Sequence, residues 1–172
     1  MERFAGTAAR ILEATGVVLV RKGPRKLSMW DVAAEAEISR PTLYRWFPSK
    51  EELLEAFGLY EQHKYDDGMA AAVAGLDGLG ALDAALVFIV EFQRSYSLGG
   101  LAAHEPEHVL HQMERTLPIM RKRVAALIPG PDARAVAGAI VRLAISHCVI
   151  KGDDRKDFLA QLRQAAGVTA SA

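Results

Sequence analysis

The chain has 172 residues, and its 21 Lys and Arg balance its 21 Asp and Glu, so the formal net charge is zero. Half of the residues (51%) are hydrophobic, which excludes an intrinsically disordered chain, whereas the longest strongly apolar run, 84–90, is far shorter than the roughly 20 residues that span a membrane. One cysteine, Cys148, excludes an internal disulfide framework, and the first residues lack a secretory signal, so we expect a cytoplasmic protein without a membrane segment.

Helical signals dominate the first part of the chain, where Ala, Leu, Arg and Glu are frequent and few stretches alternate with period two. The Gly-Pro pair at 23–24 is expected to end a first helix. Ser28 with Asp31, and Ser49 with Glu52, have the spacing of capping boxes that begin helices. The expected helices cover about residues 3–22, 28–36, 39–47 and 49–66.

The second part of the chain is also predicted to be helical. Pro106 suits the first turn of a helix, and the Pro-Gly-Pro run at 129–131 is a stop signal. Asp132 is expected to cap the helix that follows. The expected helices cover about residues 81–97, 106–128 and 132–150, with a last helix that follows 152–154 and ends near 166. The sequence therefore predicts an all-α fold.

The most informative segment, 28–53, reads as two short helices joined by a three-residue turn. Leu43 and Phe47 are four residues apart, so they share one helix face and are expected to pack inward. The opposite face mixes cations, a hydroxyl and aromatic rings, which suits a reader of the DNA major groove better than it suits a solvated amphipathic helix. The outward residues are Arg40, Thr42, Tyr44, Arg45 and Trp46.

The charge distribution agrees with this interpretation. Residues 1–50 contain nine Lys and Arg against five Asp and Glu, whereas residues 51–172 contain twelve against sixteen. A basic end on an acidic body allows one end of the molecule to approach phosphate groups while the rest is repelled by them. A chance fluctuation would give a bias of the same size, so the charge alone does not decide.

The segment resembles the DNA-binding domain of the TetR family, and the recognisable similarity covers roughly the first 55 residues. The matching residues are Ser28, Val32, Ala33, Ala36, Ile38, Ser39, Thr42, Leu43, Tyr44, Phe47, Lys50, Glu51 and Leu53, with 9–12 and Ala14 in the first helix. The resemblance implies an N-terminal three-helix helix-turn-helix domain over 1–50 and a C-terminal helical domain for ligand binding and dimerisation over 51–172. It also implies a regulator rather than an enzyme, with no cofactor.

The resemblance further implies a repressor that a small, largely apolar ligand releases from a palindromic operator. A DNA-binding dimer without a physiological effector is the alternative. Arg40 and Pro41 occupy positions that touch base edges in the family, and Lys50 lies at a helix N-terminus that favours phosphate. The residues implied to contact double-stranded DNA are Ser28, Ser39, Arg40, Pro41, Thr42, Tyr44, Arg45, Trp46 and Lys50.

Glu37 departs from the family pattern, because the family usually has glycine at this position of the turn. If Glu37 adopts a left-handed conformation, it costs roughly 1 kcal/mol relative to glycine. Its carboxylate would also face DNA phosphate unfavourably if it pointed outward. The geometry of this turn is therefore a question for the structure.

The segment 104–108 reads His-Glu-Pro-Glu-His and matches the H-E-x-x-H pattern of zinc peptidases. That chemistry needs both histidines one turn apart on a continuous helix, and Pro106 is expected to begin the helix, which leaves His104 outside it. A metal-dependent hydrolase that uses His104 and His108 is therefore a remote alternative. His108 and His111 remain three residues apart, which leaves a two-histidine metal site open beside the simpler interpretation of a polar helix surface.

Aromatic residues at helical spacing characterise the second domain. Phe88, Phe92 and Tyr96 form a stripe that is ordinary core by itself, but the resemblance implies that part of it lines a ligand pocket. The polar candidates for that pocket are His108, Gln112, Arg115 and His147.

The helix expected at 132–150 carries two apolar stripes, and two stripes imply two packing partners. The stripes are Val136, Ile140, Leu143 and His147, and Ala137, Val141, Ala144 and Cys148. A buried helix of a monomer would have the same pattern, so the resemblance alone implies that the last two helices form a homodimer. We place Ile140 and Leu143 in that interface.

Overall fold

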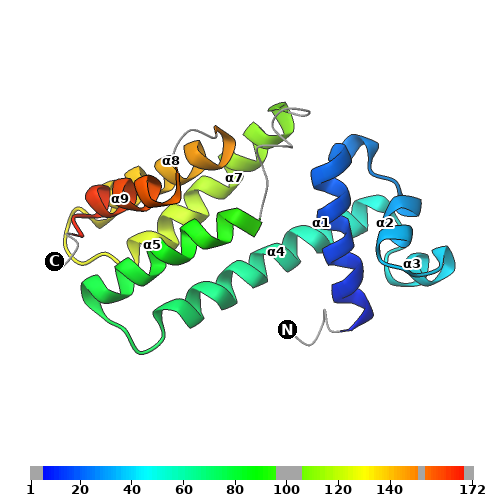
Figure 1. The fold of residues 1–172 in the computed structure, drawn as a ribbon, viewed down its shortest axis with the longest axis horizontal. Helices are drawn as coiled ribbons and strands as arrows, with labels where there is room; N and C mark the ends of the chain where they lie inside the picture. Colours follow the sequence, from blue (N-terminus) through cyan, green and yellow to red (C-terminus); the bar gives the residue numbers. More distant parts are fainter. Residues whose placement is uncertain (1–5, 96–105, 151–153, 169–172) are drawn as a thin grey trace. The chain divides into compact units, whose positions relative to one another are not determined.

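The computed structural model describes residues 6–95, 106–150 and 154–168 (Figure 1). All regular elements in these ranges are α-helices, as predicted. They are α1 (Thr7–Lys26), α2 (Met29–Glu35), α3 (Arg40–Trp46), α4 (Lys50–Val73), α5 (Gly78–Ser95), α7 (Pro106–Ala125), α8 (Ala133–Val149) and α9 (Arg155–Ala166). None of these helices is long and apolar enough to cross a membrane.

The chain divides into two compact units, Met1–Asp67 and Gly68–Ala172. The boundary lies within α4, which begins at Lys50, the last residue of the first domain as the sequence analysis divides the chain. Helix α4 continues to Val73, seven residues beyond the predicted end. Each unit has its own buried core.

Local signals explain the helix boundaries of the first unit. Gly23 leaves helical geometry at φ 76° and ψ 162°, so the regular part of α1 ends where the Gly-Pro pair predicts, and a short turn continues to Lys26. The side chains of Ser28, Ser39 and Ser49 then accept hydrogen bonds from backbone N–H groups three residues later, at 3.2, 3.3 and 3.1 Å. These bonds satisfy N–H groups that have no acceptor within their own helix.

The core of the first unit lies between α1, α2, α3 and the start of α4. Its fully buried side chains are Ile11, Leu12, Val18, Val32, Leu43 and Leu53. Thr15 is also buried, and its hydroxyl donates to the Ile11 carbonyl at 2.8 Å, so the polar group is satisfied inside the helix. A Cβ on Gly16 would lie 3.2 Å from the Phe57 ring, so the absent side chain leaves room for that ring.

The second unit packs α5, α7, α8 and α9 around one core (Figure 1). Arg163 of α9 donates to both carboxylate oxygens of Asp83 on α5, at 2.6 and 2.9 Å. This bidentate pair lowers the pKa of Asp83, chiefly through the hydrogen bonds from Arg163. The buried core residues are Leu86, Ile89, Val90, Val124, Ala137, Ile140, Val141, Ala144, Phe158 and Leu162.

Two predictions about α8 need correction. Asp132 makes no side-chain capping bond, because its φ of −86° and ψ of 0° differ from the extended geometry that capping requires. By contrast, Asp154 caps α9 by accepting from two backbone N–H groups at 2.7 and 2.9 Å. Ile140 is completely buried in the core of its own unit, so it is not available to a partner chain.

Candidate nucleic-acid interface

Helix α3 has the two faces that its sequence predicts. Leu43 is fully buried and Phe47 is 8% exposed, so both anchor the helix to the core of the first unit. On the other face, Tyr44 is 49% exposed and Trp46 is 44% exposed. The side chains that accompany them are Arg40, Pro41 and Arg45, which are exposed, and Thr42, which is half-buried. Exposed cations beside aromatic rings can contact phosphate oxygens and base edges.

The first turn of α3 is fixed by its own hydroxyl groups. The Ser39 Oγ accepts from the Thr42 backbone N–H at 3.3 Å, and it lies 2.8 Å from the Thr42 Oγ1. Pro41, at the start of the helix, has a φ that is already helical and lacks an N–H that would need an acceptor. The backbone that carries Arg40 is therefore held in one conformation.

The turn between α2 and α3 settles the question about Glu37, whose φ is +52°. The Glu37 N–H donates to the Ala34 carbonyl at 3.2 Å, and the Ile38 N–H donates to the Ala33 carbonyl at 3.0 Å. This pair of bonds is a Schellman motif, in which the first residue past the helix is left-handed and is usually glycine. Glu37 is thus left-handed in this turn, and its side chain is exposed.

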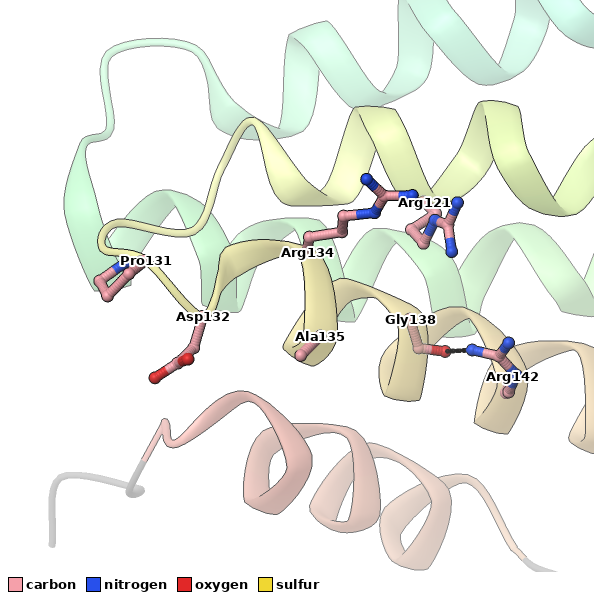
Figure 2. Close-up of a pocket in the computed structure, with 7 residues that line it drawn as sticks. All are labelled: Arg121, Pro131, Asp132, Arg134, Ala135, Gly138 and Arg142. Atoms are coloured by element: carbon pink, nitrogen blue, oxygen red, sulfur yellow. Dashed lines mark hydrogen bonds between the residues drawn. The ribbon is translucent and has the colours of Figure 1, made fainter.

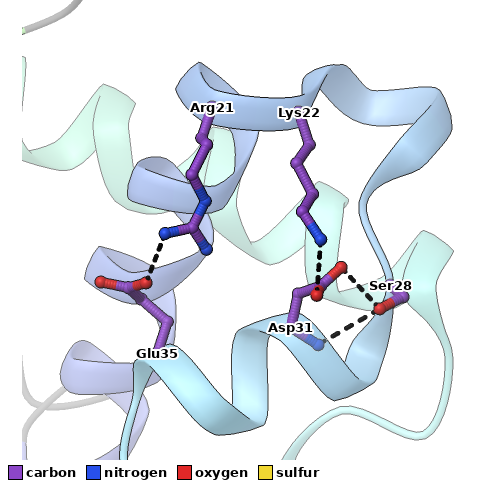
Figure 3. A network of polar contacts seen from close by, with 5 residues as sticks. All are labelled: Arg21, Lys22, Ser28, Asp31 and Glu35. Carbon is purple, nitrogen blue, oxygen red and sulfur yellow. Dashed lines mark hydrogen bonds and ion pairs between the residues drawn. The ribbon is translucent and has the colours of Figure 1, made fainter.

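A network of polar contacts joins α1 to α2 (Figure 3). Lys22 Nζ donates to Asp31 Oδ1 at 2.7 Å, and the Ser28 hydroxyl donates to Asp31 Oδ2 at 2.7 Å. These hydrogen bonds hold the pKa of Asp31 below its usual 3.8, and the bond from Lys22 is the largest cause. Arg21 and Glu35 form a second pair at 3.1 Å. Ser28 thus caps α2 and gives its single hydroxyl proton to Asp31 rather than to the exterior.

Trp30 is a residue that the sequence analysis missed. It lies in the first turn of α2 with 57% of its surface exposed, and the guanidinium of Arg40 lies over its ring. The sequence shows only a large aromatic residue in the first turn of the helix, between Met29 and Asp31. The structure shows that both of these neighbours are buried, whereas Trp30 is exposed. Lys50 lies at the start of α4, where its Nζ donates to the Arg25 carbonyl at 3.2 Å.

The structure brings together some of the residues predicted to line a ligand pocket. Phe88 and Phe92 are half-buried with ring centres 5.6 Å apart, and the Phe88 ring fills the space where a side chain on Gly68 would stand. Arg115 is exposed on α7. Tyr96 lies outside the described residues, and so do the side chains of His108 and Gln112.

His147 takes part in a polar cluster that includes a residue missed by the sequence analysis, Gln93. Gln93 Nε2 donates to the Ala144 carbonyl at 2.8 Å, so its Oε1 is the atom that faces His147 Nδ1 at 3.2 Å. His147 Nδ1 therefore carries the proton in this contact. The other side of the imidazole stacks on Phe158 with ring centres 3.8 Å apart. Gln93 was detectable as a polar residue four positions after the buried Ile89.

The histidine motif cannot be assembled from the described residues, because α7 is described from Pro106 onward and 104 lies outside them. The two-histidine site at His108 and His111 stays a prediction, because the His108 side chain is also outside the described residues. Across 6–95, 106–150 and 154–168, no group of three or more His, Cys, Asp or Glu side chains is arranged to hold a metal ion.

Comparison with known proteins agrees with this geometry. Residues 11–57 match the family described as "Bacterial regulatory proteins, tetR family". A Haemophilus influenzae protein described as an uncharacterized HTH-type transcriptional regulator is 42% identical over 50 residues, which are 29% of this chain and only 27% of that protein. The fold is similar to a TetR-like regulator from Rhodococcus sp. RHA1, with a TM-score of 0.72 and 23% identity over 94% of this chain and 93% of that one.

A putative TetR-family regulator from Rhodococcus sp. has a TM-score of 0.71 and 21% identity over 99% of this chain and 100% of that one. At this identity the two crystal structures establish the fold, whereas the similarity to the family is confined to residues 11–57. The metal-dependent hydrolase alternative has no support among these relatives. Residues 11–57 are thus similar to the tetR family of bacterial regulatory proteins, and the fold is similar to TetR-like regulators over nearly the whole chain.

Proposed function

We propose that the chain is a DNA-binding transcriptional regulator that acts in the cytoplasm and places α3 in the major groove. The observation that carries this proposal is the exposed face of α3, where Arg40, Tyr44, Arg45 and Trp46 project from a helix anchored by Leu43. A solvated surface helix gains nothing from two half-exposed aromatic rings beside two arginines, whereas a DNA reader uses them on base edges and backbone.

The proposed contacts divide by their position on the helices. Arg40 and Pro41 lie in the first turn of α3, where side chains enter the groove and meet base edges. Lys50 lies at the N-terminus of α4, where its ammonium and the helix amides favour phosphate. Thr42, Tyr44, Arg45, Trp46 and the capping residue Ser39 are proposed to contact phosphates or neighbouring bases. Ser28 contributes its capping role, because its proton is already engaged.

We further propose a repressor that binds a palindromic operator as a homodimer through α8 and α9. Ile140 is buried in its own unit, so the contact is assigned to the outward faces of these helices. The exposed small residues of these helices are Ala139 and Ser146 on α8 and Ala160 on α9, whereas Ala135 and the exposed Arg142 of α8 line a hollow that is open to solvent. Small side chains permit close approach of helices from two copies. Two protomers related by a twofold axis then read two half-sites.

Release by a small, largely apolar ligand is proposed to involve Phe88, Phe92, Tyr96, His108, Gln112, Arg115 and His147. The half-buried phenylalanine pair and the Gln93–His147 hydrogen bond support this assignment. The effector must bind the DNA-free conformation more tightly than the DNA-bound one. A dimer without a physiological effector is the second candidate, which is favoured by the stacking of Phe158 on His147, because this contact fills the space beside the imidazole.

Selection from random double-stranded DNA by the full chain tests the proposal. We expect enrichment of a palindromic site, and we expect Arg40→Ala, with its fold intact by circular dichroism, to select a site without the preference at one base pair of each half-site. Leu59→Ala, a substitution at an exposed position outside α3, serves as the control and should select the same site. If the unaltered chain enriches no sequence, the proposed function is wrong. Native mass spectrometry of protein from its own host separates the two effector alternatives, because a retained ligand supports the first.

A further inference from the structure

The acidic second part of the chain contains a basic segment. Residues 115–142 hold six Lys and Arg but a single acidic residue, Asp132, although residues 51–172 as a whole are acidic. In the structure this segment forms the end of α7, the following turn and the first half of α8. The positive charge of the second unit is therefore concentrated on these two helices and the turn between them.

Three of these cations line the same hollow, which has a volume of about 390 Å³ and is open to solvent (Figure 2). Arg121 comes from α7, and Arg134 and Arg142 come from α8. The Asp132 carboxylate also belongs to the lining, but it points away from the guanidinium groups. In the described part of the chain, no hydrogen bond or ion pair joins any of these three arginines to a carboxylate.

Gly138 makes this arrangement possible. It is a buried residue in the middle of α8, where glycine is a poorer helix former than alanine, and its backbone is not left-handed. A Cβ at this position would lie 3.1 Å from Arg142 Nη1 and 3.7 Å from Arg121 Cδ. The missing side chain thus makes room for the Arg142 guanidinium over the helix, whereas 3.7 Å to Arg121 is an ordinary contact distance. Arg142 Nη1 donates to the Gly138 carbonyl at 3.2 Å. That bond orients a guanidinium whose other N–H groups remain available.

The start of α8 adds backbone donors on the same side. Asp132, Arg134 and Ala135 line the hollow. The Ala135 N–H donates to the Asp132 carbonyl at 2.9 Å, but the first N–H groups of a helix have no acceptor within it. The Asp132 side chain does not supply the missing acceptor, because it makes no capping bond. The three guanidinium groups and the positive end of the helix dipole repel one another, and no carboxylate is paired with them. A bound anion would relieve this repulsion.

We propose that this hollow is a binding site for a phosphate-type oxyanion, either free or carried by a small molecule. The planar guanidinium groups of Arg121, Arg134 and Arg142 match the geometry of phosphate oxygens. An open hollow lined by charged groups suits a hydrated anion and not the apolar effector proposed above. The site is independent of the proposed DNA interface, because all of its residues lie in the second unit.

The experiment is a calorimetric titration of the full chain with inorganic pyrophosphate at neutral pH and constant ionic strength. We expect one saturable site per protomer. Arg134→Gln and Arg121→Gln should each weaken binding by about tenfold or more, because each removes charge-assisted hydrogen bonds to the anion. Lys156→Gln removes the same charge from an exposed position on α9 and should change the affinity by less than about twofold.

Gly138→Ala tests the geometry without changing the charge. The new methyl group displaces the Arg142 guanidinium, so pyrophosphate binding should weaken, while the thermal unfolding temperature without anion stays equal or rises, because alanine favours the helix. Equal weakening by Arg134→Gln and Lys156→Gln would overturn the proposal in favour of general charge attraction. Absence of a saturable site would also overturn it. Loss of the site in the presence of a random DNA duplex would assign the hollow to DNA backbone instead.

Discussion

Arg40 of α3 lies over the ring of Trp30 of α2, with the guanidinium carbon 5.8 Å from the ring centre. Trp30 is 57% exposed, so its ring forms part of the surface that carries the proposed DNA contacts. The quadrupole of an indole ring attracts a cation that lies over its face. At exposed sites this interaction contributes about 0.5–1 kcal/mol. The contact therefore restricts Arg40 before DNA arrives and identifies Trp30 as a positioning residue.

Trp30→Ala should weaken operator binding by about two- to fivefold, because Arg40 loses the surface that orients it. The loss should concern the base position that Arg40 reads, and the dependence of affinity on salt should stay unchanged. Trp30→Phe keeps an aromatic face and should recover most of the preference. Titration of operator variants at several salt concentrations checks this. A reduced salt slope in Trp30→Ala would mean that Trp30 contacts the DNA backbone itself.

Replacing Arg40 and replacing Lys50 should change DNA binding in different ways. Arg40→Ala should relax the preference at one base pair in each half-site, because a bidentate arginine–guanine contact discriminates by about 1–3 kcal/mol. Lys50→Ala should weaken all sequences alike and lower the salt slope by about one phosphate per protomer. The same titrations measure both. Uniform loss in Arg40→Ala on every operator variant would make Arg40 a phosphate contact.

Glu37→Gly should leave the free energy of unfolding unchanged or raise it by up to about 1 kcal/mol, because Glu37 has a φ of +52°. Glu55→Gly is the matched control: Glu55 is exposed within α4, so the same substitution should destabilise by about 1 kcal/mol. Urea unfolding of both variants gives the comparison. A clear loss of stability in Glu37→Gly would show that the Glu37 side chain makes a contact that outweighs the backbone strain.

Asp31 should make stability depend on pH in the acid range. Its folded pKa lies below the usual 3.8, chiefly because Lys22 donates to it, so the folded state binds this proton more weakly than the unfolded state does. The stabilising contribution of Asp31 is complete at pH values above its unfolded pKa of 3.8. It is lost as the pH falls through 3.8 toward the lower folded pKa. Asp31→Asn should lower the free energy of unfolding at neutral pH. It should also make that free energy depend less on pH in the acid range, as measured by urea unfolding at a series of pH values. If the free energy of unfolding of Asp31→Asn depended on acid pH as steeply as that of the unaltered chain, this assignment would be contradicted.

Ala139→Glu should yield monomers if the outward faces of α8 and α9 form the dimer. Ala139 is exposed in the isolated protomer, so the new carboxylate is tolerated there and is buried only in a dimer. Ala70→Glu, at an exposed position of α4, is the control and should leave the dimer intact. Light scattering with size exclusion gives the masses. A dimer in Ala139→Glu that is as tight as the unaltered one would place the interface elsewhere.

Short-range features could be predicted well from the sequence. Ser28 and Ser39 cap α2 and α3 because capping depends on the few residues that follow, and the burial of Leu43 and Phe47 follows from their spacing. The cap at Asp132 failed for the same local reason, because the backbone that follows a Pro-Gly-Pro run does not take the extended geometry that a cap needs.

Features that depend on packing could not be predicted in the same way. The extension of α4 to Val73 depends on Met69, which packs on the core of the second unit, and on Gly68, which faces Phe88. The stripe that contains Ile140 is apolar whether its partner is α9 or another copy of the chain, so periodicity alone could not assign it. Trp30 and Gln93 were missed because each acts through a residue far away in the sequence.

The chain has two tryptophans, Trp30 and Trp46, and both belong to the first unit and are exposed. Intrinsic fluorescence excited in the indole band therefore originates from the α2–α3 surface alone. Stacking of bases near either ring would quench that emission, so operator binding can be followed without a label. Because the second unit contributes no indole, any change in emission on adding pyrophosphate would be a direct optical signal that the two units communicate.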